Sequence, residues 1–386
     1  MGRERVLIVG YSTRALAESV VTAGWECSSI DAFGDLDQKA RVRNVAMQRD
    51  LGRPYSAAAA VAAAGRIAAP CVAYTGNLEN HAAAVQRLGL GRELLGNSPA
   101  ALLRSRDFGE LRRVVRRAGG RLPRTYLPGD PRPRLLRTDF LAKPARGGGG
   151  QGIRELRDVA RVPDRDLVQE RIDGTPGSVS FVADGRSALV LGVARGLAGE
   201  AVFGATGFRY CGSLFPLTVV ARALERLEAI VQSVTRAFGL VGLNGMDFVL
   251  RGDQPFVVEL NPRYSASMEL IQRAGVKDLF ALHAAACRGS LPSSLPRLGP
   301  GVWGKAVVWA RRNAVAPETR SWLDRGDIRD IPFPGEQIRS RTPVCTVFGQ
   351  GRDADACRAA LVETARTVES ALLSVREPVR ASAAVR

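Results

Sequence analysis

The 386-residue sequence predicts a mixed fold with α/β and α+β parts: a parallel α/β sheet at the N-terminus, an α+β core and a small C-terminal domain. Three features indicate this arrangement. Strand and helix patterns alternate from 1 to 100, which is typical of a parallel sheet covered by helices. An antiparallel meander and a long helix come next, and a linker rich in Ser, Pro and Gly precedes the last part. We expect domains at 1–100, 101–290 and 302–386.

In the first domain, the sequence predicts a strand at 6–10, a helix at 14–23 and a second strand at 26–30. An alanine-rich helix at 57–69 and a strand at 70–74 continue the alternation. The first strand is not followed by the G-x-G-x-x-G pattern of dinucleotide-binding folds. We therefore do not predict binding of NAD.

The loop at 75–80 comes after a predicted strand, at the edge of the sheet where open α/β folds place ligands. It carries Glu79 and Asn80. These side chains could contact a substrate or cap the next helix, and we favour capping.

The second domain begins with a basic helix predicted at 102–118, followed by a proline-rich loop and a strand that ends near Lys143. Gly147, Gly148, Gly149 and Gly150 come shortly after it. Consecutive glycines let backbone amides approach a phosphate closely, and the lysine supplies a positive charge. The G-K-[ST] ending of a Walker A loop is missing, and a glycine run alone is also typical of a flexible linker. The interpretation as a phosphate-binding loop therefore depends on metal-binding residues further along the chain.

Further strands are predicted at 166–172, 178–183 and 187–194, and a helix at 218–238 leads into a hairpin at 244–263. The strand that carries the lysine, the strand at 166–172 and the hairpin could enclose a nucleotide between two layers. The third domain mixes short strands with a final helix, predicted at 354–373.

The hairpin carries the most informative group of side chains. With its turn centred on Asp253, Asp247 lies opposite Glu259, and the strand period of two points Glu259, Asn261 and Arg263 in the same direction. Two carboxylates facing each other repel unless a cation lies between them. Mg2+ prefers such oxygen ligands and needs few of them from the protein. We predict a metal site at Asp247, Glu259 and Asn261, against the alternative of a solvated hairpin face.

The composition limits the classes of partner. The formal net charge is +17, but arginines are spread over the whole chain, and the only lysines are Lys39, Lys143, Lys277 and Lys305. Nucleic-acid sites usually cluster basic residues or interleave them with aromatic ones. We expect no nucleic acid as partner, because an anionic small-molecule substrate explains the charge as well.

The remaining composition is that of an ordinary globular enzyme. The cysteines lack a C-x-x-C pair and there are two histidines, so neither a zinc site nor a disulfide framework is predicted. We see neither an apolar stretch of membrane-spanning length nor a signal peptide, so we expect a cytoplasmic protein with no membrane partner. A homodimer is compatible with the sequence.

These motifs, taken in order, resemble the ATP-grasp superfamily, which includes biotin carboxylase and many carboxylate-amine ligases. The resemblance rests on Lys143-Pro144 with the glycine run, the segment at 169–174, Asn244-Gly-Met-Asp247 and Glu259-Leu-Asn-Pro-Arg263. It covers most of the chain, since the first domain is similar to the Rossmann-like domain that precedes the ATP-grasp core, and the last to its C-terminal cap.

The resemblance implies ATP and Mg2+ as cofactors, with Mn2+ as an alternative metal. It implies that Lys143 contacts the ATP phosphates and that Gly147, Gly148, Gly149 and Gly150 form a lid over them. Arg263 would stabilise the reacting anion. The remaining implied roles are an adenine hinge at Glu170, Arg171 and Ile172, and Mg2+ ligands at Asp247, Glu259 and Asn261.

This chain departs from the family at one place. It has Asp107-Phe108 where the family often has Asp-Lys, so another cation, such as Arg104 or Arg106, would have to replace that lysine.

A narrower resemblance concerns the segments at 10–19, 31–37 and 78–80, which are similar to a subgroup related to the tyramine-glutamate ligase of methanofuran synthesis. It implies an ATP-dependent C-N ligase that works through an acyl phosphate on glutamate or another amino acid, in methanofuran-type or tetrahydromethanopterin-linked cofactor biosynthesis. Two alternatives stay open: an ATP-dependent carboxylase acting through carboxyphosphate, and a non-catalytic nucleotide-binding or RNA-binding module.

Overall fold

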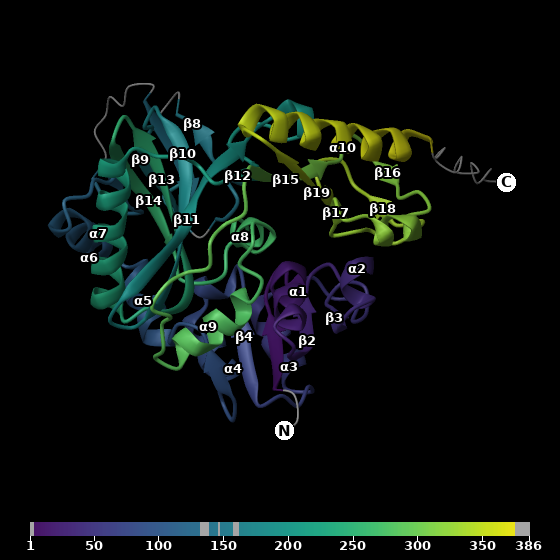
Figure 1. Ribbon diagram of the computed structural model, residues 1–386, viewed down its shortest axis with the longest axis horizontal. Helices are drawn as coiled ribbons and strands as arrows, with labels where there is room; N and C mark the ends of the chain where they lie inside the picture. The colour runs from purple at the N-terminus through teal and green to yellow at the C-terminus, as the bar shows by residue number, and fades with distance from the viewer. Residues whose placement is uncertain (1–3, 132–138, 146, 157–161, 375–386) are drawn as a thin grey trace.

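The computed structural model describes residues 4–131, 139–145, 147–156 and 162–374 (Figure 1). Within these ranges, no helix has both the length and the apolar character needed to cross a membrane. The chain forms a parallel sheet at the N-terminus, a small antiparallel sheet, and a large antiparallel sheet that extends to the C-terminal helix.

The N-terminal sheet has five parallel strands in the order β3-β2-β1-β4-β5. This order confirms the predicted α/β alternation. Buried aliphatic residues such as Leu7, Val9 and Val72 hold the sheet against its helices. The strands are β1 (Arg5–Val9), β2 (Glu26–Asp31), β3 (Arg43–Ala46), β4 (Cys71–Tyr74) and β5 (Glu93–Leu95), and the helices are α1 (Arg14–Thr22), α2 (Leu36–Lys39), α3 (Ala57–Ala64) and α4 (Ala82–Leu88), with a 3-10 turn, η1 (Leu78–Asn80).

Two helix predictions in this half of the chain were wrong. Helix α3 ends at Ala64 instead of continuing to 69, where Gly65, a poor helix former, occupies the C-cap. The helix predicted at 102–118 is two helices, α5 (Pro99–Arg106) and α6 (Phe108–Arg117). The break falls at Asp107, whose side chain accepts a hydrogen bond from the backbone of Glu110 and so caps α6.

A four-stranded antiparallel sheet comes next, in the order β6-β9-β7-β8. It comprises β6 (Thr125–Tyr126), β7 (Phe140–Pro144), β8 (Arg154–Glu155) and β9 (Asp166–Glu170). Strand β9 is shorter than predicted, so only the first residue of the expected hinge lies in it. The glycine-rich loop connects β7 to β8.

The large sheet has eight strands in the order β14-β13-β10-β11-β12-β15-β19-β17. Strand β10 begins at Thr175, earlier than predicted, so the turn before it is shorter. Strand β15 pairs with β12, and the C-terminal region therefore continues the sheet of the second region. The strands are β10 (Thr175–Asp184), β11 (Ala188–Ala198), β12 (Tyr210–Phe215), β13 (Val241–Arg251), β14 (Gln254–Asn261), β15 (Val302–Trp309), β17 (Ile328–Arg329) and β19 (Pro343–Gly351).

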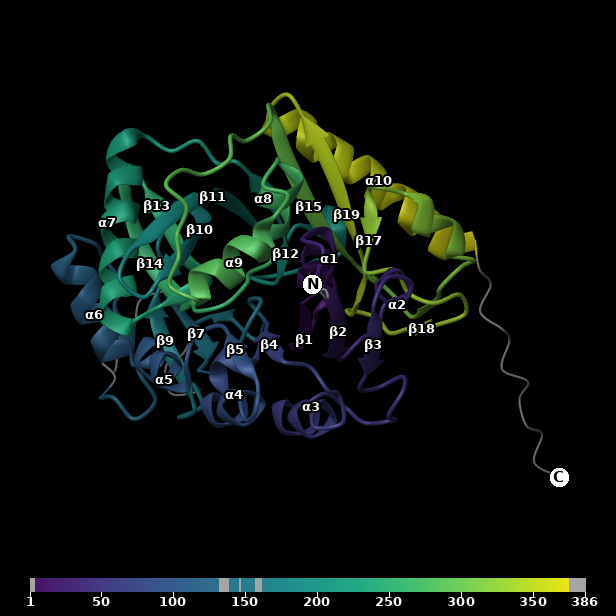
Figure 2. The same ribbon diagram turned by 60° about the horizontal axis from the view of Figure 1, so that its bottom comes forward.

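Helices cover both faces of this sheet. Helix α7 (Ala221–Phe238) packs its apolar side on one face, against Phe181, Met246 and Phe248. On the other face, α8 (Met268–Arg273) and α9 (Leu279–Cys287) fill the space between the large sheet and the N-terminal strands (Figure 2).

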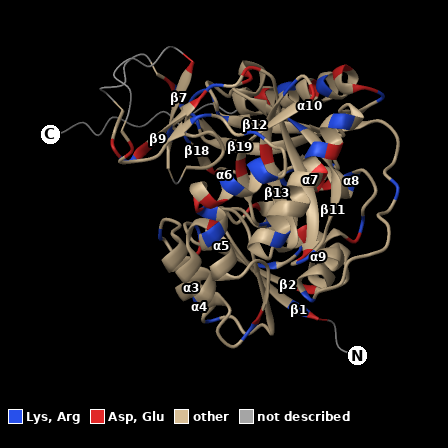
Figure 3. Cartoon of the chain, turned by 90° about the vertical axis from the view of Figure 1, so that its left-hand side faces the viewer, with Lys and Arg blue, Asp and Glu red and all other residues tan. Residues whose placement is uncertain are grey.

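The C-terminal region adds helix α10 (Ala354–Ser374), which packs along β15 and β19. A small two-stranded sheet, β16 (Ala314–Val315) with β18 (Gln337–Ile338), lies beside it, and two 3-10 turns complete the described structure, η3 (Ala201–Phe203) and η4 (Arg320–Asp324). Figure 3 shows basic and acidic residues interspersed on the side that carries α5, α6 and α7.

Candidate active site

The predicted ladder at the hairpin is confirmed. In the register of β13 with β14, Asp247 pairs with Glu259 and Gly245 pairs with Asn261. A bulge directly after Asp247 interrupts the regular pairing. The amide of Asn261 donates a hydrogen bond of 2.9 Å to Oδ2 of Asp247. Two carboxylates and an amide therefore gather at one point of the sheet.

The electrostatics of this point favour a bound cation. Burial, together with the negative charge of Glu259, raises the pKa of Asp247 to about 6. Within the described parts of the chain, no three acidic, histidine or cysteine side chains gather into a metal-binding group. Two carboxylates with one amide oxygen fit Mg2+, which keeps several waters in its shell. These residues therefore fit the metal that the sequence predicts.

Arg263 is fixed in place by a residue of the N-terminal region. Its Nε donates a 2.8 Å hydrogen bond to Oε1 of Glu79, and its Nη1 donates to the carbonyl of Tyr264 at 3.0 Å. Its Nη2 reaches Oδ1 of Asn261 at 3.3 Å. Gly76 packs against the guanidinium, since a Cβ at this position would lie 3.5 Å from it. The arginine thus lies between the parallel sheet and the carboxylates.

The expectation that Glu79 caps the next helix was wrong. Helix α4 has His81 at its N-cap and no side-chain capping bond. Glu79 is instead buried beside two guanidiniums, those of Arg263 and Arg106. Burial alone would raise the pKa of Glu79, but these two positive charges outweigh it and hold the pKa below its usual value.

Arg106 enters the site from the end of α5. Its Nη1 donates a 2.7 Å hydrogen bond to Oε1 of Glu259, and its Nη2 lies 3.5 Å from Glu79. Arg104, the other arginine considered for the missing lysine, is half exposed and pairs with Glu110. Of these two arginines, only Arg106 therefore contacts the candidate site.

Lys143 approaches the same carboxylates from the small sheet. It extends from β7 and donates a hydrogen bond to Oε1 of Gln169 on the neighbouring strand β9. Burial lowers the pKa of Lys143, and the charges of Glu259 and Asp247 act in the opposite direction. Lys143 therefore lies close enough to both carboxylates for their charges to act on it.

The glycine-rich loop contacts the connection that leads into β12. The backbone N–H of Tyr210 donates a 2.9 Å hydrogen bond to the carbonyl of Gly149. Gly149 and Gly150 have positive φ angles of 60° and 70°. A Cβ on Gly150 would collide with the carbonyl of Phe208. The loop can hold this position only with glycine at these places.

The predicted adenine hinge lies at the end of β9. The carboxylate of Glu170 accepts a 3.0 Å hydrogen bond from the backbone N–H of Arg124. Arg171 donates a 2.6 Å hydrogen bond to Glu155. The side chains of Glu170 and Arg171 thus have protein partners, and Ile172 lies outside the strand. A contact between this segment and adenine stays a prediction.

Sequence reasoning missed Asn97, which lies two residues beyond β5. Its Nδ2 donates to Asn244 at 2.8 Å and to the carbonyl of Pro262 at 3.0 Å, and its Oδ1 accepts from the backbone of Val241 at 2.8 Å. Asn97 thereby joins the parallel sheet to the segment just before Arg263. Its position after the carboxyl end of a parallel strand is the signal that could have identified it.

A group of hydroxyls lies beside Asp247. Ser178, on β10, is paired with Asp247 in the sheet and donates a 3.2 Å hydrogen bond to Ser267. Ser180 and Ser265 each lie within 3.5 Å of the same hydroxyl. No sequence pattern indicated this group, because its members come from a strand and from a loop that are distant in the chain.

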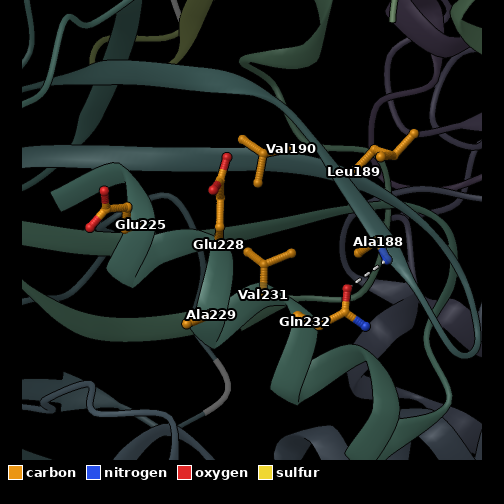
Figure 4. A pocket seen from close by; sticks show the side chains of 8 residues that line it. All are labelled: Ala188, Leu189, Val190, Glu225, Glu228, Ala229, Val231 and Gln232. Carbon is orange, nitrogen blue, oxygen red and sulfur yellow. Dashed lines mark hydrogen bonds between the residues drawn. The ribbon is translucent and has the colours of Figure 1, made fainter. Parts of the chain in front are cut away.

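One surface hollow, of about 450 Å³, lies elsewhere, between β11 and α7 (Figure 4). None of the candidate residues lines it. Its lining residues are Ala188, Leu189, Val190, Glu225, Glu228, Ala229, Val231 and Gln232.

Comparisons with known proteins agree with this geometry. Residues 110–267 match the family model described as an ATP-grasp domain. The carbamoyl phosphate synthase large chain of Kocuria rhizophila is 26% identical over 281 residues, which are 67% of this chain and 24% of that protein. This chain therefore spans about a quarter of the length of that curated relative.

Two solved structures share the fold over nearly the whole chain. Biotin carboxylase from Campylobacter jejuni, in a complex with a nucleotide, has a TM-score of 0.69 and 14% identity, and the match covers 96% of this chain and 92% of that one. L-amino acid ligase from Bacillus licheniformis has a TM-score of 0.68 and 12% identity, with 98% and 100% covered. At these identities the likeness shows a common fold.

Proposed function

We propose that this chain joins a carboxylate to an amine through an acyl phosphate, because residues 110–267 match an ATP-grasp domain and ATP-grasp enzymes are ATP-dependent ligases. The observation that carries the proposal is the grouping of Asp247, Glu259 and Asn261 on one sheet. Arg263, just after β14, contacts Asn261, and Lys143, on another sheet, is close enough for both carboxylates to act on its charge. This grouping supplies oxygen ligands for a metal and cations for phosphate and carboxylate in one place.

The chemistry explains why such a site is useful. A carboxylate does not acylate amines because its leaving group would be oxide. Attack of a carboxylate oxygen on the γ-phosphorus of ATP breaks the bond to ADP and forms an acyl phosphate. The amine nitrogen then attacks the acyl carbon, phosphate leaves with the bonding electron pair, and the nitrogen loses a proton. The products are an amide, ADP and phosphate.

The residues of the chain have separate tasks in this scheme. Lys143 would bind the phosphoryl oxygens, and Arg263, oriented by Glu79, would bind the substrate carboxylate and the oxyanion that forms from it. The glycine-rich loop, seated against Tyr210, would exclude water that otherwise hydrolyses the acyl phosphate. Asp247, Glu259 and Asn261 would hold Mg2+, which when bound neutralises part of the phosphate charge.

For the substrates, we infer glutamate or another amino acid, in the synthesis of a one-carbon cofactor of methanofuran or tetrahydromethanopterin type. The net charge of +17 supports an anionic substrate, and the resemblance of the segments at 10–19 and 31–37 supports the pathway. The enzyme would work with small molecules, without nucleic acid or membrane, in the cytoplasm, as a monomer or a homodimer.

The second candidate is an ATP-dependent carboxylase that forms carboxyphosphate from bicarbonate. The fold shared with biotin carboxylase favours it. Such an enzyme needs a biotin or another acceptor, and the sequence contains no Met-Lys-Met segment that would carry biotin. A third candidate is a non-catalytic nucleotide-binding or RNA-binding module. Such a module would need neither the predicted metal ligands nor a lysine at 143, in a chain that has four lysines and otherwise uses arginine.

The decisive experiment incubates the protein with ATP, Mg2+ and a matrix of carboxylates and amines, including glutamate with tyramine, and measures ADP and product mass together. We expect ADP formation that depends on both substrates and a mass equal to their sum less water. A parallel series with bicarbonate tests for carboxylation, which would overturn the ligase proposal. Loss of turnover in Glu259→Gln, with retention in Glu228→Gln on the distant face of α7, would locate the chemistry at the hairpin.

A further inference from the structure

Arg106 is partly buried and makes an incomplete set of contacts. One nitrogen, Nη1, donates to Glu259, but Nε and Nη2 are buried and have no hydrogen-bond partner. No other arginine in the described part of the chain carries a buried nitrogen in this state. Its nearest further neighbour is the carboxylate of Glu79, 3.5 Å from Nη2.

Leaving these buried donors without acceptors destabilises the protein. By contrast, Arg14, which is buried more deeply, bonds to carboxylates through Nε, Nη1 and Nη2. A guanidinium that is held beside a candidate phosphate site with two unused donors is suited to an acceptor that arrives with the substrate. Phosphoryl oxygens are such acceptors, because they match the fork of the guanidinium.

The partner that Arg106 does have is a predicted metal ligand. Glu259 cannot fully serve both a guanidinium at 2.7 Å and a divalent cation, because the two positive charges repel each other at such distances. A divalent cation at Glu259 would therefore weaken the contact between Glu259 and Arg106. The arginine that is released has Glu79 behind it, which keeps the guanidinium within the site.

We propose that Arg106 is a phosphoryl-binding residue that neutralises Glu259 in the absence of metal and turns to the phosphate oxygens when Glu259 takes a divalent cation. This proposal rests on the proposed function for the nature of the anion. In chemical terms, Arg106 competes with the metal on the free protein and cooperates with it once the nucleotide is bound.

The test measures metal binding and nucleotide binding separately, without turnover. Mn2+ serves as the probe metal, detected by electron paramagnetic resonance, and a non-hydrolysable ATP analogue is titrated by calorimetry. In Arg106→Gln we expect Mn2+ to bind the nucleotide-free protein about tenfold more tightly, since a competing positive charge is gone. The Mn2+ complex of the analogue should bind about tenfold more weakly, since a charge-assisted phosphate contact is lost.

Two further variants keep the result interpretable. Arg104→Gln, two residues earlier on the same helix, should leave both affinities unchanged, because Arg104 is half exposed and pairs with Glu110. Arg106→Lys keeps the positive charge and should restore part of the affinity for the analogue. It also serves as the test variant if Arg106→Gln does not fold. Weaker Mn2+ binding in both Arg106 variants would overturn the exchange, and unchanged analogue binding would overturn the phosphate contact.

These readouts also separate this proposal from the proposed function. If the variants change Mn2+ and analogue binding as described but the protein joins no carboxylate to an amine, the proposed role of Arg106 is supported and the proposed ligase function is wrong. If the protein forms the amide but the Arg106 variants bind Mn2+ and the analogue as the parent does, the ligase function is supported and the proposed role of Arg106 is wrong.

Discussion

The Nε of Arg263 donates a 2.8 Å hydrogen bond to the carboxylate of Glu79, which lies 184 positions earlier in the chain. Glu79 comes after β4 of the parallel sheet, and Arg263 comes after β14 of the large sheet. The orientation of the arginine therefore depends on the packing of one sheet against the other. A shift of the N-terminal region would move the group that we expect to bind the substrate carboxylate.

Replacing Glu79 by glutamine should lower kcat more than it weakens nucleotide binding, because Glu79 orients Arg263 by a direct hydrogen bond and contacts Arg106 only at 3.5 Å. Glutamine keeps the shape and can still accept a hydrogen bond, but it no longer holds two guanidiniums by charge. We expect kcat to fall about 10- to 100-fold, as found when a positioned group is misplaced by about 1 Å. The measurement is steady-state kinetics on the ligase reaction, together with calorimetric titration of an ATP analogue.

A matched control is Glu93→Gln, since Glu93 lies on the same sheet but pairs with Arg288 at the surface. It should leave kcat unchanged. An unchanged kcat in Glu79→Gln would show that Arg263 does not depend on this contact.

Local patterns carried most of what the sequence predicted correctly. Asp247 and Glu259 face each other because a turn and a period of two fix the register of a hairpin, and both signals lie within about twenty residues. The alternation of strands and helices likewise predicted the parallel sheet. In contrast, the helix break at Asp107 was missed because its capping role competes with a continuous basic helical pattern.

Contacts between distant segments could not be derived from one sequence. The role of Glu79 depends on the docking of two sheets, and the same docking selects Arg106 over Arg104. Nothing in the linker at 289–301 indicated that β15 would pair with β12. The sequence thus predicted the groups needed for the chemistry, while their supporting contacts depend on the tertiary fold.

The glycine-rich loop allows a test with an internal control. Gly150→Ala places a Cβ against the carbonyl of Phe208 at a φ of 70°, so the loop must move away from its seat. At Gly148 a Cβ meets nothing within 4 Å, and the φ is not positive. We expect Gly150→Ala to lower kcat/KM for ATP at least about tenfold, because closing loops position substrates and exclude water.

In Gly148→Ala, kcat/KM should change less than about twofold, since neither strain nor a collision is introduced. The ratio of ADP formed to amide formed adds a second readout, because a displaced loop admits water to the acyl phosphate. If Gly150→Ala and Gly148→Ala lowered kcat/KM equally, the close approach of Gly150 to Phe208 would not matter for the reaction.

Asp247 should make the metal-free protein less stable at neutral pH than in weak acid. Its pKa of about 6 in the folded state lies above its ordinary value of 3.8, so protonation favours folding. Stability should therefore fall as the pH rises from about 4 to 6, and stay lower above that. In Asp247→Asn this part of the pH dependence should disappear, with a gain on the order of 1–3 kcal/mol at pH 7.

Urea denaturation in the presence of a chelator, at about pH 5 and about pH 8, on either side of the folded pKa, measures this difference. Asp253→Asn, in the turn of the same hairpin, serves as the control and should reproduce the pH dependence of the parent. Addition of Mg2+ should stabilise the parent more at the higher pH than at the lower, because the ionised carboxylate binds the metal. A destabilised Asp247→Asn would show that the carboxylate has a structural partner.

Arg14 joins three parts of the chain and allows a prediction about stability. Its guanidinium, which is 1% exposed, bonds to Glu269 on α8 and to Asp330 after β17, at 2.8 Å for the latter. Lys305 contacts Glu269 from the other side. Replacing Arg14 by methionine leaves the buried carboxylate of Glu269 and the partly buried carboxylate of Asp330 without this positive charge, which costs about 3–5 kcal/mol.

Urea denaturation measures this cost, with Arg41→Met as the control. Arg41 is half exposed and lies 3.7 Å from Glu18, so its loss should cost less than about 1 kcal/mol. The double variant Arg14→Met with Glu269→Gln should recover part of the lost stability, because one of the two unpaired carboxylates is removed. Since Glu269 lies in the first turn of the helix that follows the loop of Arg263, Arg14→Met should also lower kcat. A stable variant with full activity would show that the network does not support the site.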